Sequence, residues 1–221
     1  MSESVSELRL GPSSTALLVI DMQNAFCHSE GSFAKMTAGR DLSISMCQDA
    51  VIGCARLIHA ARQASIPVIY TRYVYHPNYA DGGVLLAKYP EMRETGALAA
   101  GSWDADIIND LAPSDTDFVI DKSRYSAFYG TRLEPILHGL GTSTIVCCGV
   151  TTNICVESSV RDAAQRDYGV YVVADATGEL TRDRHDNALA ILDYGFADVV
   201  TIDDIVQALK VPATDSTGGH S

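Results

Sequence analysis

The sequence lacks several features that define whole classes of protein. It has no apolar run near the roughly 20 residues that cross a bilayer, and no cluster of lysines and arginines. Its 221 residues carry 16 Lys and Arg against 28 Asp and Glu, a formal net charge of −12. An acidic chain without a basic patch is not expected to bind nucleic acid or an anionic membrane surface. These absences are compatible with a small, neutral substrate.

The chain also lacks a secretory signal pattern and any C-x-x-C pair. Met1–Leu10 is polar and acidic, unlike a signal peptide, so we expect a cytoplasmic protein. Six cysteines are present, and two of them, Cys147 and Cys148, lie side by side in an apolar run. We therefore expect reduced thiols rather than a disulfide framework or a zinc site.

Short apolar segments alternate with helical patterns along the chain, and 47% of the residues are hydrophobic, which suits one globular domain. We expect strands at 15–20, 66–71, 117–122, 143–148, 169–175 and 197–202, and helices at 43–65, 105–111, 131–140, 153–166, 184–192 and 203–209. We expect loops at 22–40 and 72–104, the second of them a lid or substrate wall. The alternation predicts an α/β fold, a three-layer αβα sandwich around a mostly parallel sheet. A single domain would span 13–209, between loose termini at 1–12 and 212–221.

Three residues that can carry chemistry stand at predicted strand ends. Asp21 follows the first strand, Lys122 ends the third, and Cys155 comes soon after the fourth. Ligands of open parallel sheets bind at the carboxyl ends of the strands. Taken singly, the three residues fit a turn aspartate, a solvated lysine and a buried inert thiol. Together they can form a nucleophile with a base and a charge that holds it.

The surroundings of Cys155 favour a reactive thiol. The apolar run 143–148 leads through Gly149 into a helical pattern, which places the cysteine in the first turn of a helix. Thr152 or Asn153 is positioned to cap that helix. The positive end of a helix dipole stabilises a thiolate, so we expect a lowered pKa for Cys155.

At this level of detail the sequence resembles the isochorismatase-like cysteine hydrolases. That family includes N-carbamoylsarcosine amidase, biuret hydrolase, ureidoacrylate amidohydrolase and nicotinamidase. The likeness covers roughly residues 13–209, and four segments carry it: 16–26, 122–131, 149–156, and 158–163 together with 175–177. The resemblance implies an isochorismatase-like fold and a catalytic triad of Asp21, Lys122 and Cys155.

The same resemblance implies further details of the site. It places a cis peptide between Val150 and Thr151, and an oxyanion hole formed by the backbone N–H groups of Thr151 and Cys155. Donors near a helix N-terminus can converge on one oxygen in this way. The expected reaction is attack of Cys155 on an amide or ureido carbonyl, with Asp21 as the acid and base.

Neither a metal nor another cofactor is expected. The nicotinamidases of the family carry an Asp-x-His metal pattern after the second strand, and here that region reads Tyr73–Asn78 without such a pair. The six histidines also lie at no ligand spacing.

The substrate-binding candidates lie near the strand ends and in the irregular segments. They are Gln23, Asn24, Arg72, Tyr73, Trp103, Arg124, Tyr125, Phe128 and Glu179. Each aromatic can equally be a packing residue, 73–79 can be a subunit interface, and Arg124 can pair with Glu157 or Asp162. Segments 101–104 and 122–128 resemble the ureidoacrylate and biuret branch of the family, which favours a small ureido or carbamoyl substrate.

Alternative functions stay open at this point. One is an isochorismatase-type vinyl-ether hydrolase, although true isochorismatases lack the nucleophilic cysteine that Cys155 supplies here. Others are a non-catalytic small-ligand binder and a redox-sensing thiol protein. Because oligomers are common in the family, we expect a homodimer or a homotetramer.

Overall fold

A six-stranded sheet forms the centre of the computed structural model, which describes residues 8 and 10–210. The strand order is β3-β2-β1-β4-β5-β6, and every neighbouring pair is parallel. The strands are β1 (Thr15–Ile20), β2 (Val68–Tyr73), β3 (Phe118–Lys122), β4 (Thr144–Val150), β5 (Gly169–Gly178) and β6 (Asp198–Val200). The predicted α/β class with a parallel sheet is confirmed.

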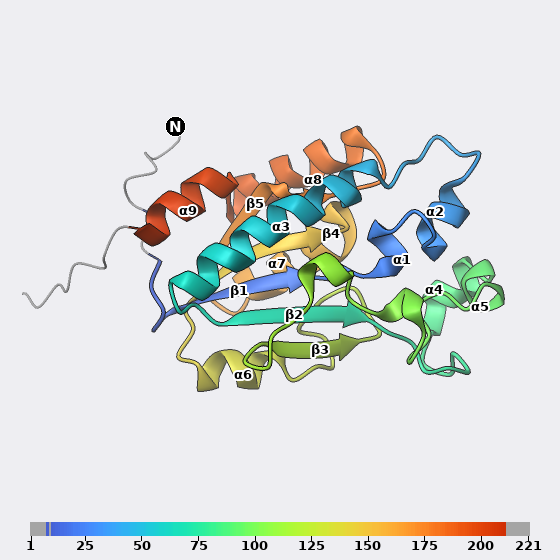
Figure 1. Cartoon of the computed structure of the whole chain (residues 1–221), viewed down its shortest axis with the longest axis horizontal. Coiled ribbons are helices and arrows are strands. Elements are labelled where there is room, and N and C mark those ends of the chain that lie inside the picture. Colours follow the sequence, from blue (N-terminus) through green and yellow to red (C-terminus); the bar gives the residue numbers. More distant parts are fainter. Residues whose placement is uncertain (1–7, 9, 211–221) are drawn as a thin grey trace, which may run out of the picture.

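Helices cover the sheet and complete the three layers. Helix α3 lies across the strands with α9 beside it, and α7 and α8 pack against each other near β5 (Figure 1). The principal helices are α3 (Ser45–Gln63), α6 (Leu133–Gly139), α7 (Glu157–Ala164), α8 (Arg182–Gly195) and α9 (Ile202–Lys210). The short helices are α1 (Asn24–Cys27), α2 (Ser32–Thr37), α4 (Gly83–Lys88) and α5 (Glu91–Glu94).

The central strand β1 belongs to a sheet whose parallel strands all end on the same side. All six of its residues are buried, as its unbroken apolar sequence predicts for a strand covered on both faces. Since every strand is parallel, the carboxyl ends of β1 to β4 meet at one end of the sheet. Figure 1 shows α1, α2, α4 and α5 gathered beyond those strand ends. These helices build the walls of a cavity described below.

Several predicted boundaries were wrong in the segments that form this end. The predicted loop 22–40 contains α1 and α2, and the predicted loop 72–104 contains α4, α5 and the 3₁₀ turn η2 (Trp103–Ala105). The predicted helix 105–111 is reduced to the 3₁₀ turn η3 (Asn109–Leu111). Strand β2 runs on to Tyr73, so Arg72 and Tyr73 are strand residues.

Gly149 allows β4 to approach the end of β1 closely. Its φ is +116°, and a Cβ atom there would lie 2.1 Å from the carbonyl oxygen of Ile20. A side chain at this position would therefore push apart the two strands that precede Asp21 and Cys155.

The ends of the chain were expected to be loose at 1–12 and 212–221. The second range, and most of the first, lie outside the described residues. Leu10 lies within the described part, and it is not loose as expected, because its side chain packs into the hydrophobic core. Over the described part of the chain, no helix combines the length and the hydropathy needed to cross a bilayer.

Candidate active site

Asp21 stands directly after β1, where the backbone turns sharply. Its φ is +53°, an uncommon value for a residue with a side chain, and its N–H donates to the Thr71 carbonyl oxygen at 3.1 Å. The Thr71 hydroxyl donates to Asp21 Oδ1 at 2.7 Å. Asp21 is fully buried. The neighbouring strand β2 thus fixes both the backbone and one carboxylate oxygen.

Lys122 reaches Asp21 from β3, across the intervening strand β2. Its Nζ donates to Asp21 Oδ2 at 2.6 Å and to the Arg124 carbonyl oxygen at 3.1 Å. It also lies 4.4 Å from the centre of the Tyr73 ring. Two of its N–H donors thus go to oxygen atoms, and the ring faces the charge. These contacts hold the Lys122 side chain in place beside Asp21.

Cys155 lies in a π-helical turn, η4 (Thr152–Val156), that joins β4 to α7. The Val156 N–H donates to the Thr151 carbonyl oxygen, and the Ser159 hydroxyl donates to the Cys155 carbonyl oxygen at 2.7 Å. The predicted side-chain cap is absent from this turn. Thr152 Oγ1 donates instead to the Gly178 carbonyl oxygen at 3.0 Å and lies 2.9 Å from His185 Nδ1. Single π-turns of this kind are frequent at functional sites.

The environment of the Cys155 thiol raises its pKa, so the expectation of a lowered value was wrong. Burial has the largest effect because it disfavours the charged thiolate. The Lys122 charge lowers the pKa, whereas the Asp21 charge and a hydrogen bond to Asp21 raise it. The raised pKa favours a neutral Cys155 thiol, and the adjacent Asp21 side chain is placed where it could accept the thiol proton.

The peptide bond between Val150 and Thr151 is cis, as the family resemblance implied. It lies between β4 and η4, one residue after Gly149. Thr151 lies beside Cys155 on the wall of a cavity. Asp21, Lys122 and Cys155, which are far apart in the sequence, are brought to one place at this end of the sheet.

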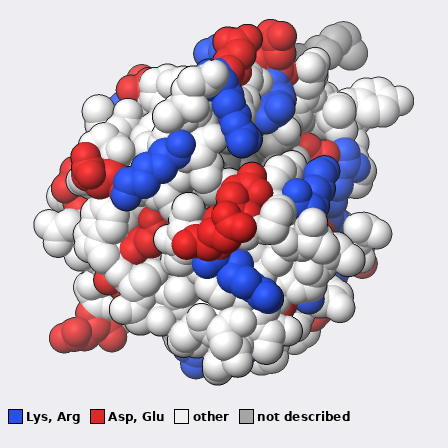
Figure 2. All heavy atoms as spheres, turned by 90° about the vertical axis from the view of Figure 1, so that its right-hand side faces the viewer, with Lys and Arg blue, Asp and Glu red and all other residues white. Residues whose placement is uncertain are grey.

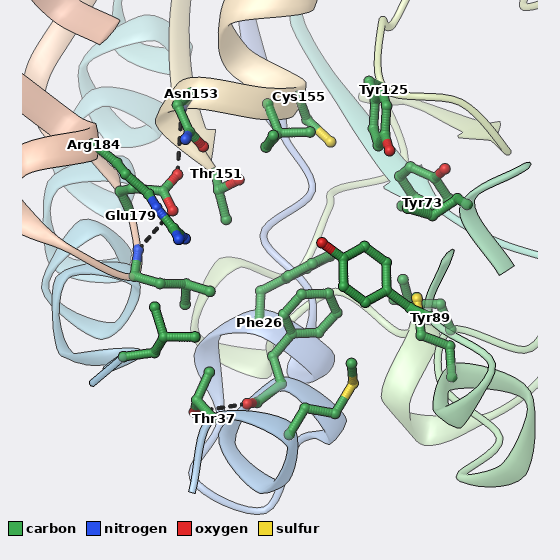
Figure 3. Close-up of a pocket in the computed structure, with 18 of the residues that line it drawn as sticks. Phe26, Thr37, Tyr73, Tyr89, Tyr125, Thr151, Asn153, Cys155, Glu179 and Arg184 are labelled. Carbon is green, nitrogen blue, oxygen red and sulfur yellow. Dashed lines mark hydrogen bonds between the residues drawn. The ribbon is translucent and has the colours of Figure 1, made fainter. Parts of the chain in front are cut away.

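The cavity has a volume of about 480 Å³. Figure 3 shows the Cys155 sulfur pointing toward the side where Tyr73 and Tyr125 lie. Of the predicted site residues, the cavity is lined by Thr151 and Cys155 and by the substrate candidates Tyr73, Tyr125 and Glu179. The Glu179 carboxylate is buried and accepts hydrogen bonds from the N–H groups of Asn153 and Leu180. It therefore ties the end of β5 to the turn that carries the cysteine.

Two predicted substrate residues, Gln23 and Asn24, have structural roles instead. The Gln23 amide donates to the carbonyl oxygens of Tyr73 and Ala105 and accepts from the Tyr73 N–H. Asn24 Nδ2 donates to the Trp103 carbonyl oxygen at 2.8 Å. Both side chains hold the segments after β1 and β2 together and do not line the cavity.

Arg72 and Arg124 also point away from the cavity. Arg72 pairs with Asp121 on the next strand, at 2.7 Å. Arg124 Nη1 donates to the carbonyl oxygens of Asp81 and Ser123 and lines a second hollow. The alternative pairing of Arg124 with Glu157 or Asp162 is not formed, because those carboxylates pair with Arg161 and Arg166.

The remaining two candidates, Trp103 and Phe128, do not line the cavity either. Trp103 is half exposed and packs edge-on against His28. Phe128 is buried against the Tyr168 ring, with Arg166 over its face. The alternative of a tyrosine interface at 73–79 also fails, since Tyr73, Tyr75 and Tyr79 are buried within this chain.

Sequence reasoning missed most of the cavity wall. Its apolar part comes from the short helices and their flanks, and from one residue after β5: Phe26, Phe33, Met36, Leu42, Leu85, Tyr89, Met92, Leu98 and Leu180. Its polar part includes Arg40, Lys88, Asn153 and Arg184. Phe26 lies in one of the family-like segments, which is the one signal that could have indicated it. Within residues 8 and 10–210, no group of three or more His, Cys, Asp and Glu side chains is placed to hold a metal ion.

Comparisons with known proteins agree with this geometry. An isochorismatase domain model matches residues 15–204. The ureidoacrylate amidohydrolase RutB of Methylobacterium radiotolerans is 35% identical, over 96% of this chain and 85% of the relative. The protein of the same name from Agrobacterium fabrum is 33% identical, over 94% of this chain and 96% of the relative.

Solved structures show the same likeness. A cysteine hydrolase from Pseudomonas syringae pv. phaseolicola superposes with a TM-score of 0.82 at 29% identity, covering 95% of this chain and 99% of the other. N-carbamoylsarcosine amidase from Thermoplasma acidophilum superposes with a TM-score of 0.69 at 28% identity, covering 86% and 97%.

Proposed function

Because this chain belongs to the isochorismatase family, we propose that it cleaves a C–N bond of a small ureido, carbamoyl or carboxamide compound through a Cys155 thioester. Relatives named ureidoacrylate amidohydrolase support its assignment as a hydrolase of carbon–nitrogen bonds other than peptide bonds. The observation that carries the mechanism is the buried Asp21–Lys122 pair beside a cysteine on the cavity wall.

In the first half of the reaction, the Cys155 sulfur attacks the substrate carbonyl carbon. Asp21 takes the thiol proton as the S–C bond forms, and the carbonyl oxygen becomes an oxyanion. The C–N bond then breaks, and protonated Asp21 returns the proton to the departing nitrogen, which leaves as ammonia or an amine. The product on the enzyme is a thioester. A base already in contact with the nucleophile suits this step.

In the second half, water cleaves the thioester. Asp21 takes a proton from the water, whose oxygen bonds to the carbonyl carbon. The C–S bond breaks and the thiolate regains a proton, which restores the resting thiol. Lys122 holds the carboxylate in position throughout, and its charge favours the thiolate over the buried thiol.

The N–H groups of Thr151 and Cys155 are our candidates for the oxyanion hole. Both residues line the cavity, and η4 opens a helical segment whose N-terminal N–H groups carry partial positive charge. Backbone donors that are fixed before the reaction stabilise the developing charge without reorganisation.

Replacement of Cys155 tests the proposal. Cys155→Ala and Cys155→Ser should abolish ammonia release from ureido and carbamoyl compounds while the circular dichroism and melting temperature stay near wild type. Rapid quenching and mass spectrometry of wild type should show an acyl group on Cys155. The matched control is Cys54→Ala, a buried cysteine on α3 that does not line the cavity, and it should remain active. Full turnover by Cys155→Ala would overturn the scheme.

The assay should separate the competing functions. An isochorismatase-type vinyl-ether hydrolase would release pyruvate rather than ammonia. A non-catalytic binder would release neither, and a redox-sensing thiol would show disulfide or sulfenic acid formation on mild peroxide treatment. A screen over biuret, ureidoacrylate, N-carbamoyl amino acids and simple carboxamides covers the expected substrate class.

A further inference from the structure

His185 is a buried titratable residue that the proposed reaction does not use. It lies on α8, where its N–H donates to the Thr181 carbonyl oxygen at 3.2 Å, and only 4% of the residue is exposed. Helix α8 packs against η4, the turn that carries Cys155. The ring reaches that turn, since its Nδ1 lies 2.9 Å from the Thr152 hydroxyl oxygen. A buried imidazole needs a hydrogen-bond partner, and here that partner belongs to η4.

The carbonyl oxygen of Gly178 fixes the direction of this hydrogen bond. Thr152 Oγ1 lies 3.0 Å from that oxygen, and a carbonyl oxygen only accepts, so the single hydroxyl hydrogen goes to Gly178. The hydroxyl oxygen is then left to accept, and His185 Nδ1 carries the hydrogen that it receives. Burial and the charge of Arg182 lower the pKa of His185, whereas Asp186 raises it. A neutral ring with its hydrogen on Nδ1 is therefore expected at pH 7.

Thr152 lies between the two residues whose N–H groups are our candidates for the oxyanion hole. It follows Thr151 directly, and Cys155 comes three residues later in the same turn. Thr152 is fully buried, with one side-chain contact to the end of β5 and one to α8. Two separate elements thus hold the backbone that carries both donors.

Two further contacts hold the later part of the turn. Glu179 accepts from the Asn153 N–H at 3.3 Å, a contact drawn as a dashed line in Figure 3. The Ser159 hydroxyl donates to the Cys155 carbonyl oxygen at 2.7 Å. Both contacts act on residues that follow Thr152. The start of η4 is held by the hydroxyl network of Thr152.

Charges on the protein surface do not replace donors inside the cavity. Figure 2 shows basic and acidic side chains interspersed on the face beyond the strand ends, so their effects oppose one another and salt screens them. The negative charge that develops on a substrate oxygen is then stabilised mainly by groups at the cavity wall. Backbone N–H groups do this when they are placed before the reaction, and a displacement of about 1 Å can lower a rate about 100-fold. The position of η4 therefore matters to the rate.

We propose that His185 is a positioning residue that donates its Nδ1–H to Thr152 and thereby fixes η4. The Thr151 and Cys155 N–H groups are then both held where they donate to one substrate oxygen. The inference rests on the proposed function for the oxyanion hole, whereas the hydrogen bond itself does not depend on catalysis. The role belongs to the ring nitrogen attached to Cγ. An asparagine amide nitrogen is also attached to Cγ and can replace it, but glutamine places its amide one carbon further out.

Substitutions at His185 test the role through kcat and KM, with the substrate that the ammonia screen identifies. His185→Leu should lower kcat about 100-fold with little change in KM, because misplaced donors weaken the transition state more than the substrate complex. His185→Asn should retain most of kcat, and His185→Gln should resemble His185→Leu. Equal kcat values in His185→Leu and His185→Asn, or a loss confined to KM, would overturn the proposal.

Changes at Thr152 show whether His185 acts through it. Thr152→Val removes the hydroxyl and should lower kcat as His185→Leu does, and the double variant should lose little more, because both changes break one contact. The matched control is Thr15→Val, a buried threonine at the opposite end of β1 whose hydroxyl accepts from the Gly11 N–H. Its kcat should stay near wild type. Circular dichroism establishes that each variant is folded, and additive losses in the double variant would contradict the proposal.

Nuclear magnetic resonance of the ring tests the hydrogen bond without catalysis. With isotope-labelled histidine, the nitrogen shifts of His185 should show a hydrogen on Nδ1 at pH 7, in wild type and in Cys155→Ala alike. The amide resonances of Thr151 and Cys155 should move further in His185→Leu than in His185→Asn, although both changes remove the ring. These results would support the positioning contact even if wild type released no ammonia, in which case only the hydrolase proposal would fail. A His185 ring without a hydrogen on Nδ1 would overturn the inference.

Discussion

The Lys122 ammonium and the Asp21 carboxylate form a fully buried ion pair, with Nζ 2.6 Å from Oδ2. The two residues come from β3 and β1, which are separated by β2. Removing two charges from water costs free energy that their attraction only partly returns, so such a pair is weak support for stability. Its value here is in placing a carboxylate and a positive charge beside the Cys155 thiol.

Loss of one partner of this pair should destabilise the fold strongly. Lys122→Met leaves the Asp21 carboxylate buried without its cation, so we expect the free energy of unfolding to fall by about 3–5 kcal/mol. The double variant Asp21→Asn/Lys122→Met should recover much of that loss, because no buried charge remains. Urea unfolding measures both effects. The matched control is Arg56→Met, which breaks the exposed pair with Asp203 and should cost less than about 1 kcal/mol.

The aromatic ring of Tyr73 should matter more than its hydroxyl. The ring faces the Lys122 ammonium, and the hydroxyl donates to the Ser123 carbonyl oxygen and accepts from Tyr75. Tyr73→Leu removes a desolvated cation–π contact worth about 2 kcal/mol, so kcat/KM should fall by roughly 30-fold. Tyr73→Phe keeps the ring, so it should retain most of the wild-type value. An equal loss of kcat/KM in both variants would contradict this role of the ring.

The strand ends could be predicted from the sequence because their signals are local. The apolar runs before Asp21, Lys122 and Cys155 predict buried parallel strands, and the topology of such sheets places their carboxyl ends together. The cavity wall could not be predicted in the same way. Helices α1 and α2 have four and six residues, too few for a reliable helical period.

The sequence also did not predict which groups the polar side chains contact. Arg124 is close in sequence to Lys122, and nothing local shows that it contacts the carbonyl oxygens of Asp81 and Ser123 rather than a carboxylate. Gln23 and Asn24 belong to a family-like segment, which indicates importance but does not separate a substrate contact from a backbone clamp. Only tertiary packing separates these roles, since the clamped backbone comes from the distant segments Tyr73 and 103–105.

The pKa of Cys155 gives a test in which burial and charge have opposite effects. Burial and Asp21 raise the pKa above its ordinary value, whereas Lys122 lowers it, so the free enzyme should hold a neutral thiol at pH 7. Only the thiolate reacts with iodoacetamide. The alkylation rate of Cys155, followed by peptide mass spectrometry, should therefore rise steadily from pH 7 to above 9 without a plateau. Asp21→Asn should shift this curve to lower pH, because the negative charge that opposes the thiolate is gone. An exposed cysteine in a model peptide provides the reference curve, and a wild-type plateau below pH 8 would show that the helix terminus and Lys122 outweigh burial.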